Sequence, residues 1–195
     1  MQALSGIIKG IESVNTFILR IGRFVAWIAV ALMVLVILLQ VFFRYVLNNA
    51  LPWPDEAARF FMLWMTGLIA PSAYRWGGFV SIDMVKDLLG RYLSIIFNVL
   101  LLVISLGVLI IALQFGWKHI NSGWLFSSSS LRIPLDLIGG ESVRLKLAWM
   151  YMSLPVGFAL MVLVNIELML KNIHMLVDSS VDYGDAPDQI VITAE

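Results

Sequence analysis

The stretch that decides the fold runs from Phe24 to Phe43 and reads FVAWIAVALMVLVILLQVFF. It has 20 residues without a charge, and Gln40 is its only strongly polar member. At about 1.5 Å per residue, roughly 20 helical residues cross the hydrocarbon core of a bilayer. The stretch therefore predicts a transmembrane helix.

Two further stretches predict transmembrane helices on the same grounds. Tyr92 to Trp117 contains 26 residues without a charge, and Leu147 to Ile166 contains 20. The whole chain of 195 residues is 61% hydrophobic and only 13% charged, where an ordinary soluble domain has about 25% charged residues. We therefore expect an integral membrane protein.

A fourth apolar stretch, Phe60 to Tyr74, has only 15 uncharged residues. It is long enough to span if its helix begins at Pro54, because proline suits a first helical position. Asp55 and Glu56 then lie in the first turn, where the helix dipole favours acids, and Arg59 follows on the same face. The alternative is a bundle with three crossings.

The first 22 residues predict an amphipathic helix at the membrane surface, because apolar and polar residues alternate at helical spacing. The apolar face consists of Ile7, Ile8, Ile11, Val14, Ile18 and Ile21, and the polar face of Lys9, Glu12, Ser13, Thr16 and Arg20. The alternative is a short cytosolic helix that packs on a partner.

The expected fold is an all-α integral membrane protein with four transmembrane helices and an N-terminal amphipathic interfacial helix. Residues 1–22 form the interfacial helix, 23–175 the transmembrane domain, and 176–195 an acidic disordered tail. The four spans are expected at about residues 24–45, 54–75, 92–117 and 147–170.

Charge and cysteine content exclude several functions. The 13 basic and 13 acidic residues cancel, but five acids and no base lie between Asp178 and Glu195, so the preceding chain is basic by five charges. No basic stretch suits a nucleic acid. The chain has no cysteine and only two histidines, and no catalytic set appears, so we expect no enzyme activity, metal or cofactor.

The predicted spans contain almost no charge, although a substrate pathway requires polar or charged groups inside a bundle. Their polar residues are most simply interhelical hydrogen-bond partners. Glu167 and Lys171, four residues apart at the end of the last span, predict an ion pair at the surface. The composition favours a protein that supports another membrane protein.

The region between Arg44 and Asp83 carries an ordered set of motif residues. These are Arg44, Trp53, Asp55, Glu56, Arg59, Arg75, Gly78, Val80, Ile82 and Asp83, and a second motif comprises Trp149, Pro155, Gly157 and Phe158. In order and spacing, the chain resembles the small membrane subunit (DctQ type) of TRAP transporters, the tripartite ATP-independent periplasmic uptake systems, over about residues 10 to 170.

The resemblance implies a machine of three parts in a bacterial inner membrane. A periplasmic binding protein captures an organic acid, often a carboxylate. A large elevator-type membrane subunit carries the substrate with sodium. The small subunit enlarges the stationary scaffold and has both termini in the cytoplasm. The implied partners are therefore the large membrane subunit, the binding protein and membrane lipids.

Three groups of residues are candidates for partner or membrane contacts. An outer-face group either contacts partners or forms only a capped helix start with a local ion pair. In an inner-face pair, Arg75 is expected to contact phosphate and Asp83 to cap a loop. An outer-loop group is expected to contact an acidic binding protein, or else to face solvent or lipid headgroups. The outer-face group consists of Arg44, Trp53, Asp55, Glu56 and Arg59. The inner-face pair is Arg75 and Asp83, and the outer-loop group consists of Lys118, Arg132, Arg144 and Lys146.

Two other functions stay open at the level of sequence. The chain is either an accessory or assembly subunit of a different membrane complex, or a self-contained channel or carrier. Co-purification with a large membrane subunit separates the first of these from the transporter hypothesis, and reconstitution of the chain alone tests the second.

Overall fold

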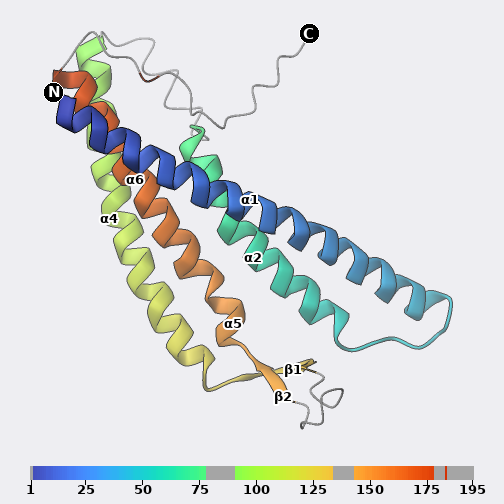
Figure 1. Ribbon diagram of the computed structural model, residues 1–195. Helices are drawn as coiled ribbons and strands as arrows, with labels where there is room; N and C mark the ends of the chain where they lie inside the picture. Colours follow the sequence, from blue (N-terminus) through green and yellow to red (C-terminus); the bar gives the residue numbers. More distant parts are fainter. Residues whose placement is uncertain (1, 78–90, 134–142, 178–182, 184–195) are drawn as a thin grey trace, which may run out of the picture.

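The computed structural model describes residues 2–77, 91–133, 143–177 and 183. Five helices and a two-stranded hairpin make up this part of the chain (Figure 1). The helices are α1 (Gln2–Tyr45), α2 (Pro54–Arg75), α4 (Arg91–Gly123), the short α5 (Ala148–Tyr151) and α6 (Ser153–Val177), and the strands are β1 (Ser127–Ile133) and β2 (Val143–Lys146).

The long helices form two antiparallel pairs, α1 with α2 and α4 with α6, and α2 packs against α6 to join the pairs (Figure 1). The start of α1, the end of α2, the start of α4 and the end of α6 gather at one end of the bundle. The hairpin lies at the opposite end, beside the start of α2. The bundle therefore has two ends with different polar structures.

Three helices are long and apolar enough to cross a membrane, namely Ser5–Tyr45, Tyr92–Gly123 and Ala148–Val177. They confirm a multi-pass helical membrane protein. The helix predicted over residues 54–75 is present as α2, but it is not among these three, because charged residues occupy its first two turns and its last turn. The crossing by α2 remains a prediction.

Helix α1 differs from the expectation, because it is one continuous helix of 44 residues with no break near residue 22. A helix of this length is about 66 Å long, roughly twice the thickness of the hydrocarbon core. Ile8, Asn15 and Leu19 in its first half are buried. The N-terminal segment thus packs on its own bundle, and its contact with a membrane surface remains a prediction.

Helices α2 and α6 approach closely at a patch of small residues. A Cβ atom on Gly67 would lie 2.5 Å from the carbonyl oxygen of Ser153, and one on Gly157 would lie 2.7 Å from the carbonyl oxygen of Gly67. Small residues four apart on one helix let the backbones meet, a common way to pack helices in membranes. This contact fixes the crossing of α2 over α6.

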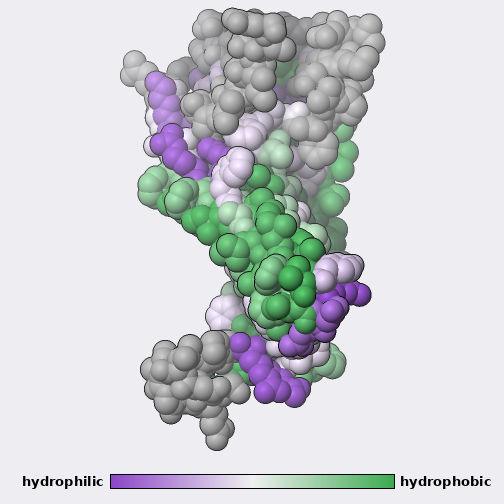
Figure 2. Space-filling model, turned by 90° about the vertical axis from the view of Figure 1, so that its right-hand side faces the viewer, coloured by the Kyte–Doolittle hydropathy of each residue, from purple (hydrophilic) through white to green (hydrophobic). Residues whose placement is uncertain are grey.

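The outer surface of the bundle is apolar around its middle. In Figure 2 hydrophobic side chains cover the centre of the visible face, and hydrophilic ones gather towards both ends. Large exposed apolar residues include Phe24 and Leu38 of α1 and Leu100 and Val108 of α4. A surface of this kind suits lipid or another membrane protein.

Candidate functional site

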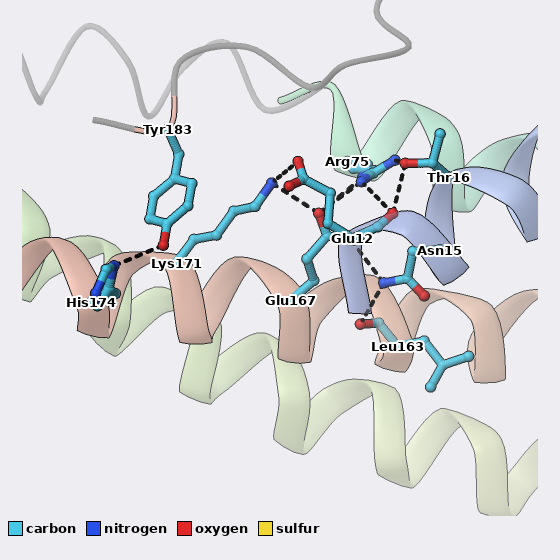
Figure 3. A network of polar contacts seen from close by, with 9 residues as sticks. All are labelled: Glu12, Asn15, Thr16, Arg75, Leu163, Glu167, Lys171, His174 and Tyr183. Carbon is cyan, nitrogen blue, oxygen red and sulfur yellow. Dashed lines mark hydrogen bonds and ion pairs between the residues drawn. The ribbon is translucent and has the colours of Figure 1, made fainter. Parts of the chain in front are cut away.

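A buried ion pair between Arg75 and Glu167 joins the end of α2 to α6. Nε and Nη2 of Arg75 donate hydrogen bonds to Oε1 of Glu167 at 3.2 and 2.8 Å (Figure 3). The side chain of Arg75 is 1% exposed and that of Glu167 is 0% exposed. The pair is therefore removed from solvent and lies at the centre of a larger polar cluster.

Helix α1 contributes the neutral partners of this pair. Nδ2 of Asn15 donates to Oε2 of Glu167 at 2.8 Å, and Nη1 of Arg75 donates to Oγ1 of Thr16 at 2.8 Å. The Thr16 hydroxyl donates in turn to the carbonyl oxygen of Glu12 at 2.7 Å, and Nη2 of Arg75 donates to the same carbonyl at 3.3 Å. Both charged groups are thus bonded to residues of a third helix.

Lys171 completes the cluster from the next turn of α6. Its Nζ lies 2.7 Å from Oε1 of Glu12 and 3.0 Å from Oε1 of Glu167. Two carboxylates and two cations, Arg75 and Lys171, therefore meet where α1, α2 and α6 converge (Figure 3). Their formal charges cancel, and we call these four residues with Asn15 and Thr16 the charge cluster.

The charge cluster corrects two predictions for this end of the molecule. Glu167 and Lys171 do form an ion pair, but it is buried rather than at the surface, because the N-terminal part of α1 covers it. Arg75 is enclosed by protein groups, so the expected contact with phosphate is wrong. Asp83, the second predicted inner-face residue, lies outside the described residues.

Burial of three of its four charges, Arg75, Glu167 and Lys171, determines what the charge cluster contributes. Removing ions from water costs several kcal/mol per ion, and the loss is offset only when every charge has well-placed partners. Removal of one partner from a buried pair costs about 3–5 kcal/mol. The charge cluster therefore favours one arrangement of α1, α2 and α6 over any arrangement that separates them.

Three further contacts flank the charge cluster and join the same helices. Nη1 of Arg23 donates to Oγ of Ser72 at 3.1 Å, and its guanidinium lies 5.0 Å from the ring centroid of Trp76. Nδ2 of Asn165 donates to the hydroxyl of Tyr74 at 2.5 Å. The last turn of α2 is thus tied to both of its neighbours.

Tyr183, beyond the end of α6, also contacts this end of the bundle. Its hydroxyl lies 2.7 Å from Nδ1 of the buried His174, and Nζ of Lys171 lies 5.7 Å from its ring centroid (Figure 3). Partial burial raises the pKa of Tyr183 above its usual value. The phenol is therefore protonated at neutral pH and can donate to an unprotonated Nδ1.

At the opposite end, Glu56 in the first turn of α2 holds the hairpin. Its carboxylate accepts hydrogen bonds from the hydroxyls of Ser128 and Ser129. It also accepts from the backbone N–H groups of Ser130 and Leu131 at 3.2 and 3.3 Å. Four donors from β1 therefore converge on one carboxylate and fix the strand against α2.

The remaining outer-face residues on α2 do not form the predicted ion pair. Asp55 and Arg59 are both exposed, and in the described part of the chain no ion pair joins Arg59 to Asp55 or Glu56. The interpretation as a local ion pair is wrong, because Glu56 turns to the hairpin instead. Pro54 begins the helix as expected, and Trp53 makes no side-chain cap.

Arg44 is exposed at the end of α1, with its guanidinium 5.9 Å from the ring centroid of Tyr45. No hydrogen bond or ion pair links it to the first turn of α2 within the residues that the structure covers. The structure therefore leaves Arg44, Asp55 and Arg59 available at the surface, and it assigns Glu56 a structural contact.

The hairpin brings two of the predicted outer-loop cations together. Arg132 and Arg144 are directly opposite across the antiparallel ladder, and both are exposed. Lys146 is opposite Ser127 in the same ladder. Lys118 does not belong to the hairpin but lies on α4, with its ammonium 5.6 Å from the ring centroid of Phe115.

Chemical groups for catalysis or metal binding were not expected, and the described residues contain no group of three His, Asp or Glu side chains that could hold a metal ion. The buried charges described above neutralise one another at one end of the bundle. These features define a class of protein: a multi-pass helical membrane protein with internally paired charges and a polar hairpin.

The sequence profile of a known family identifies this chain more closely. The profile of "Tripartite ATP-independent periplasmic transporters, DctQ component" matches residues 33–174, and the chain belongs to this family. It is a small membrane component of a TRAP transporter, from a family of transporter components rather than enzymes, which confirms the predicted resemblance. No curated protein matched the chain.

Sequence reasoning missed the role of α1 in the charge cluster and of the serines in β1. Asn15 is seven positions after Ile8 and four before Leu19, so the three residues lie on one face of α1, and Ile8 and Leu19 are buried. The position of Asn15 on this apolar face was a signal that it contacts protein. The serine run from Ser127 to Ser130 was a signal for hydroxyl donors. Neither pattern indicated the partner, which comes from another helix.

Proposed function

We propose that this chain is the small scaffold subunit of a sodium-coupled TRAP transporter that imports an organic acid, a carboxylate. In this proposal a periplasmic binding protein delivers the substrate, and a large elevator-type membrane subunit carries it. The chain encloses no substrate. It binds the large subunit and membrane lipids, and it holds the stationary part of the transporter in the membrane.

The pairing within the charge cluster is the observation that carries this proposal. Arg75, Glu167, Lys171 and Glu12 neutralise one another. A pathway for an anion requires a cationic group that is free to bind it. A cluster that is already satisfied instead stabilises a fixed contact between helices, as a scaffold requires.

Orientation follows from the family resemblance and is part of the proposal. The charge cluster lies at the end where α1 begins and α6 ends, which we assign to the cytoplasm. The hairpin lies at the opposite end, which we assign to the periplasm of a bacterial inner membrane. This orientation requires α2 to cross the bilayer.

The outer end offers two surfaces for partners. Arg44, Trp53, Asp55 and Arg59 surround the junction of α1 and α2, and we assign them to the large subunit. Arg132, Arg144 and Lys146 lie on the hairpin, and we assign them to an acidic surface of the binding protein. Glu56 supports both surfaces, because it fixes the hairpin to α2.

A tagged copy of the chain, extracted in mild detergent from cells that contain the other two components, tests the proposal. We expect it to co-purify with a large membrane subunit, and the chain alone in proteoliposomes should show no sodium-driven uptake. Uptake by the chain alone would overturn the proposal, as would recovery of the chain without any large subunit.

Charge reversal on the outer face tests the interface assignment separately. Arg59→Glu should lower uptake and complex yield, because Arg59 is exposed and makes no ion pair with the neighbouring acids. Lys9→Glu, an exposed reversal at the opposite end of α1, is the matched control. Equal loss in both variants would refute a specific role for Arg59.

A further inference from the structure

A groove of about 730 Å³ lies between α4 and α6, near the end of the bundle that carries the hairpin. Its walls are almost entirely apolar. They include Leu113, Trp117 and Ile120 from α4 and Met152, Pro155 and Val156 from α6. Because both helices are long and apolar enough to cross a membrane, the groove opens where hydrocarbon surrounds the protein.

The groove has a polar edge formed by Gln114 and Lys118 of α4. These residues are four positions apart, so they lie on the same side of the helix, one turn from each other. Among the described residues, no carboxylate lies within ion-pair distance of Lys118. An amide side chain and a lysine side chain therefore line the α4 edge of an otherwise apolar groove.

The depth of this edge follows from the sequence. Lys118 is the first charge after the uncharged run from Tyr92 to Trp117, so it lies where α4 leaves the hydrocarbon. Trp117 beside it is 64% exposed, and tryptophan and lysine are typical of the level of the lipid headgroups. Lys118 is thus at headgroup depth, and Gln114 lies one turn deeper along the same edge of the groove.

We propose that this groove binds an anionic phospholipid. One acyl chain lies along the walls formed by α4 and α6, and the phosphate accepts hydrogen bonds from Lys118 and Gln114. An acyl chain fills an irregular apolar groove without leaving polar groups unsatisfied, and the single cation selects a negative headgroup. The inference rests on the crossing of the membrane by α4, not on the transport function proposed above.

The full chain in nanodiscs of phosphatidylcholine with a minor fraction of phosphatidylglycerol provides the test. Native mass spectrometry after gentle release measures which lipids stay bound. The wild-type chain should retain phosphatidylglycerol in preference to phosphatidylcholine. Lys118→Gln should lower this preference about fivefold, as expected for one basic residue near an anionic lipid, without changing the helical content.

A second variant tests the groove itself. Ala159 lines the groove, and Ala159→Phe should displace the acyl chain and reduce retention of both lipids. Val108→Phe is the matched control, because Val108 is 61% exposed on α4 and does not line the groove. Circular dichroism of each variant separates loss of lipid from loss of fold.

Three results would overturn the proposal. The first is an unchanged preference for phosphatidylglycerol in Lys118→Gln. This variant should keep the fold, because Lys118 is exposed. The second is full lipid retention in a folded Ala159→Phe variant. The third is a photo-crosslinker at Val156 that captures only a protein partner in native membranes, which would make the groove a site for a helix.

Discussion

The guanidinium of Arg75 at the end of α2 lies 2.8 Å from the carboxylate of Glu167 in α6, although the two residues are 92 positions apart in sequence. Both side chains are almost fully buried. Within the described residues, this is the one ion pair between α2 and α6. Asn15 and Thr16 of α1 form hydrogen bonds with its two members. The contact therefore links the three helices that form one end of the bundle.

Removal of either partner should destabilise the chain more than removal of both. Arg75→Met and Glu167→Met each leave an unbalanced buried charge, which should lower the free energy of unfolding by about 3–5 kcal/mol. The double variant keeps the pair of Lys171 with Glu12 and restores neutrality. We expect a coupling free energy of up to about 3 kcal/mol from a double-mutant cycle in detergent unfolding. Additive losses would show that the pair acts as two independent residues.

Glu56→Gln should loosen the hairpin without unfolding the bundle. Hydrogen bonds to a charged acceptor contribute about 1.5–3 kcal/mol, so amide exchange at Ser130 and Leu131 should increase about tenfold or more. Hydrogen–deuterium exchange measures this directly. Asp55→Asn is the control, since Asp55 is exposed one residue earlier. Equal exchange in both variants would contradict the proposed anchoring of the hairpin.

Gly157→Val should separate α2 from α6. The added Cβ would lie 2.7 Å from the backbone oxygen of Gly67, and overpacking typically costs about 1–3 kcal/mol. The melting temperature in detergent reports the loss. Gly107→Val makes the same change in α4 where no heavy atom lies within 4 Å, and it controls for helix propensity. A similar decrease in both variants would mean that the close approach has no special role.

Arg132→Glu should weaken docking of the binding protein while it stabilises the hairpin. The new carboxylate is opposite Arg144 in the ladder, and opposite charges in such pairs contribute roughly 0.2–1 kcal/mol. We expect slower exchange at the hairpin amides, together with a higher KM for binding-protein-dependent uptake and a weaker dependence on salt. Unchanged uptake at low and high salt would exclude this surface as a docking site.

The sequence determined the class of this protein and most of its helices. Uncharged runs of sufficient length are read directly from the chain, because the bilayer requires about 20 apolar residues for each crossing. The order of motif residues from Arg44 to Asp83 was sufficient to indicate the family. The start of α2 at Pro54 was also predictable, since proline is favoured at a first helical position.

The tertiary structure alone decided which polar residues meet. Sequence reasoning placed Arg75, Glu167 and Lys171 at helix ends and therefore at the surface, since that is where isolated spans carry their charges. The continuous α1 covers that end and turns the same residues inward, and Glu56 likewise bonds to serines more than 70 positions away. Helical periodicity is a local property, whereas the partner of a buried charge depends on how separate helices pack.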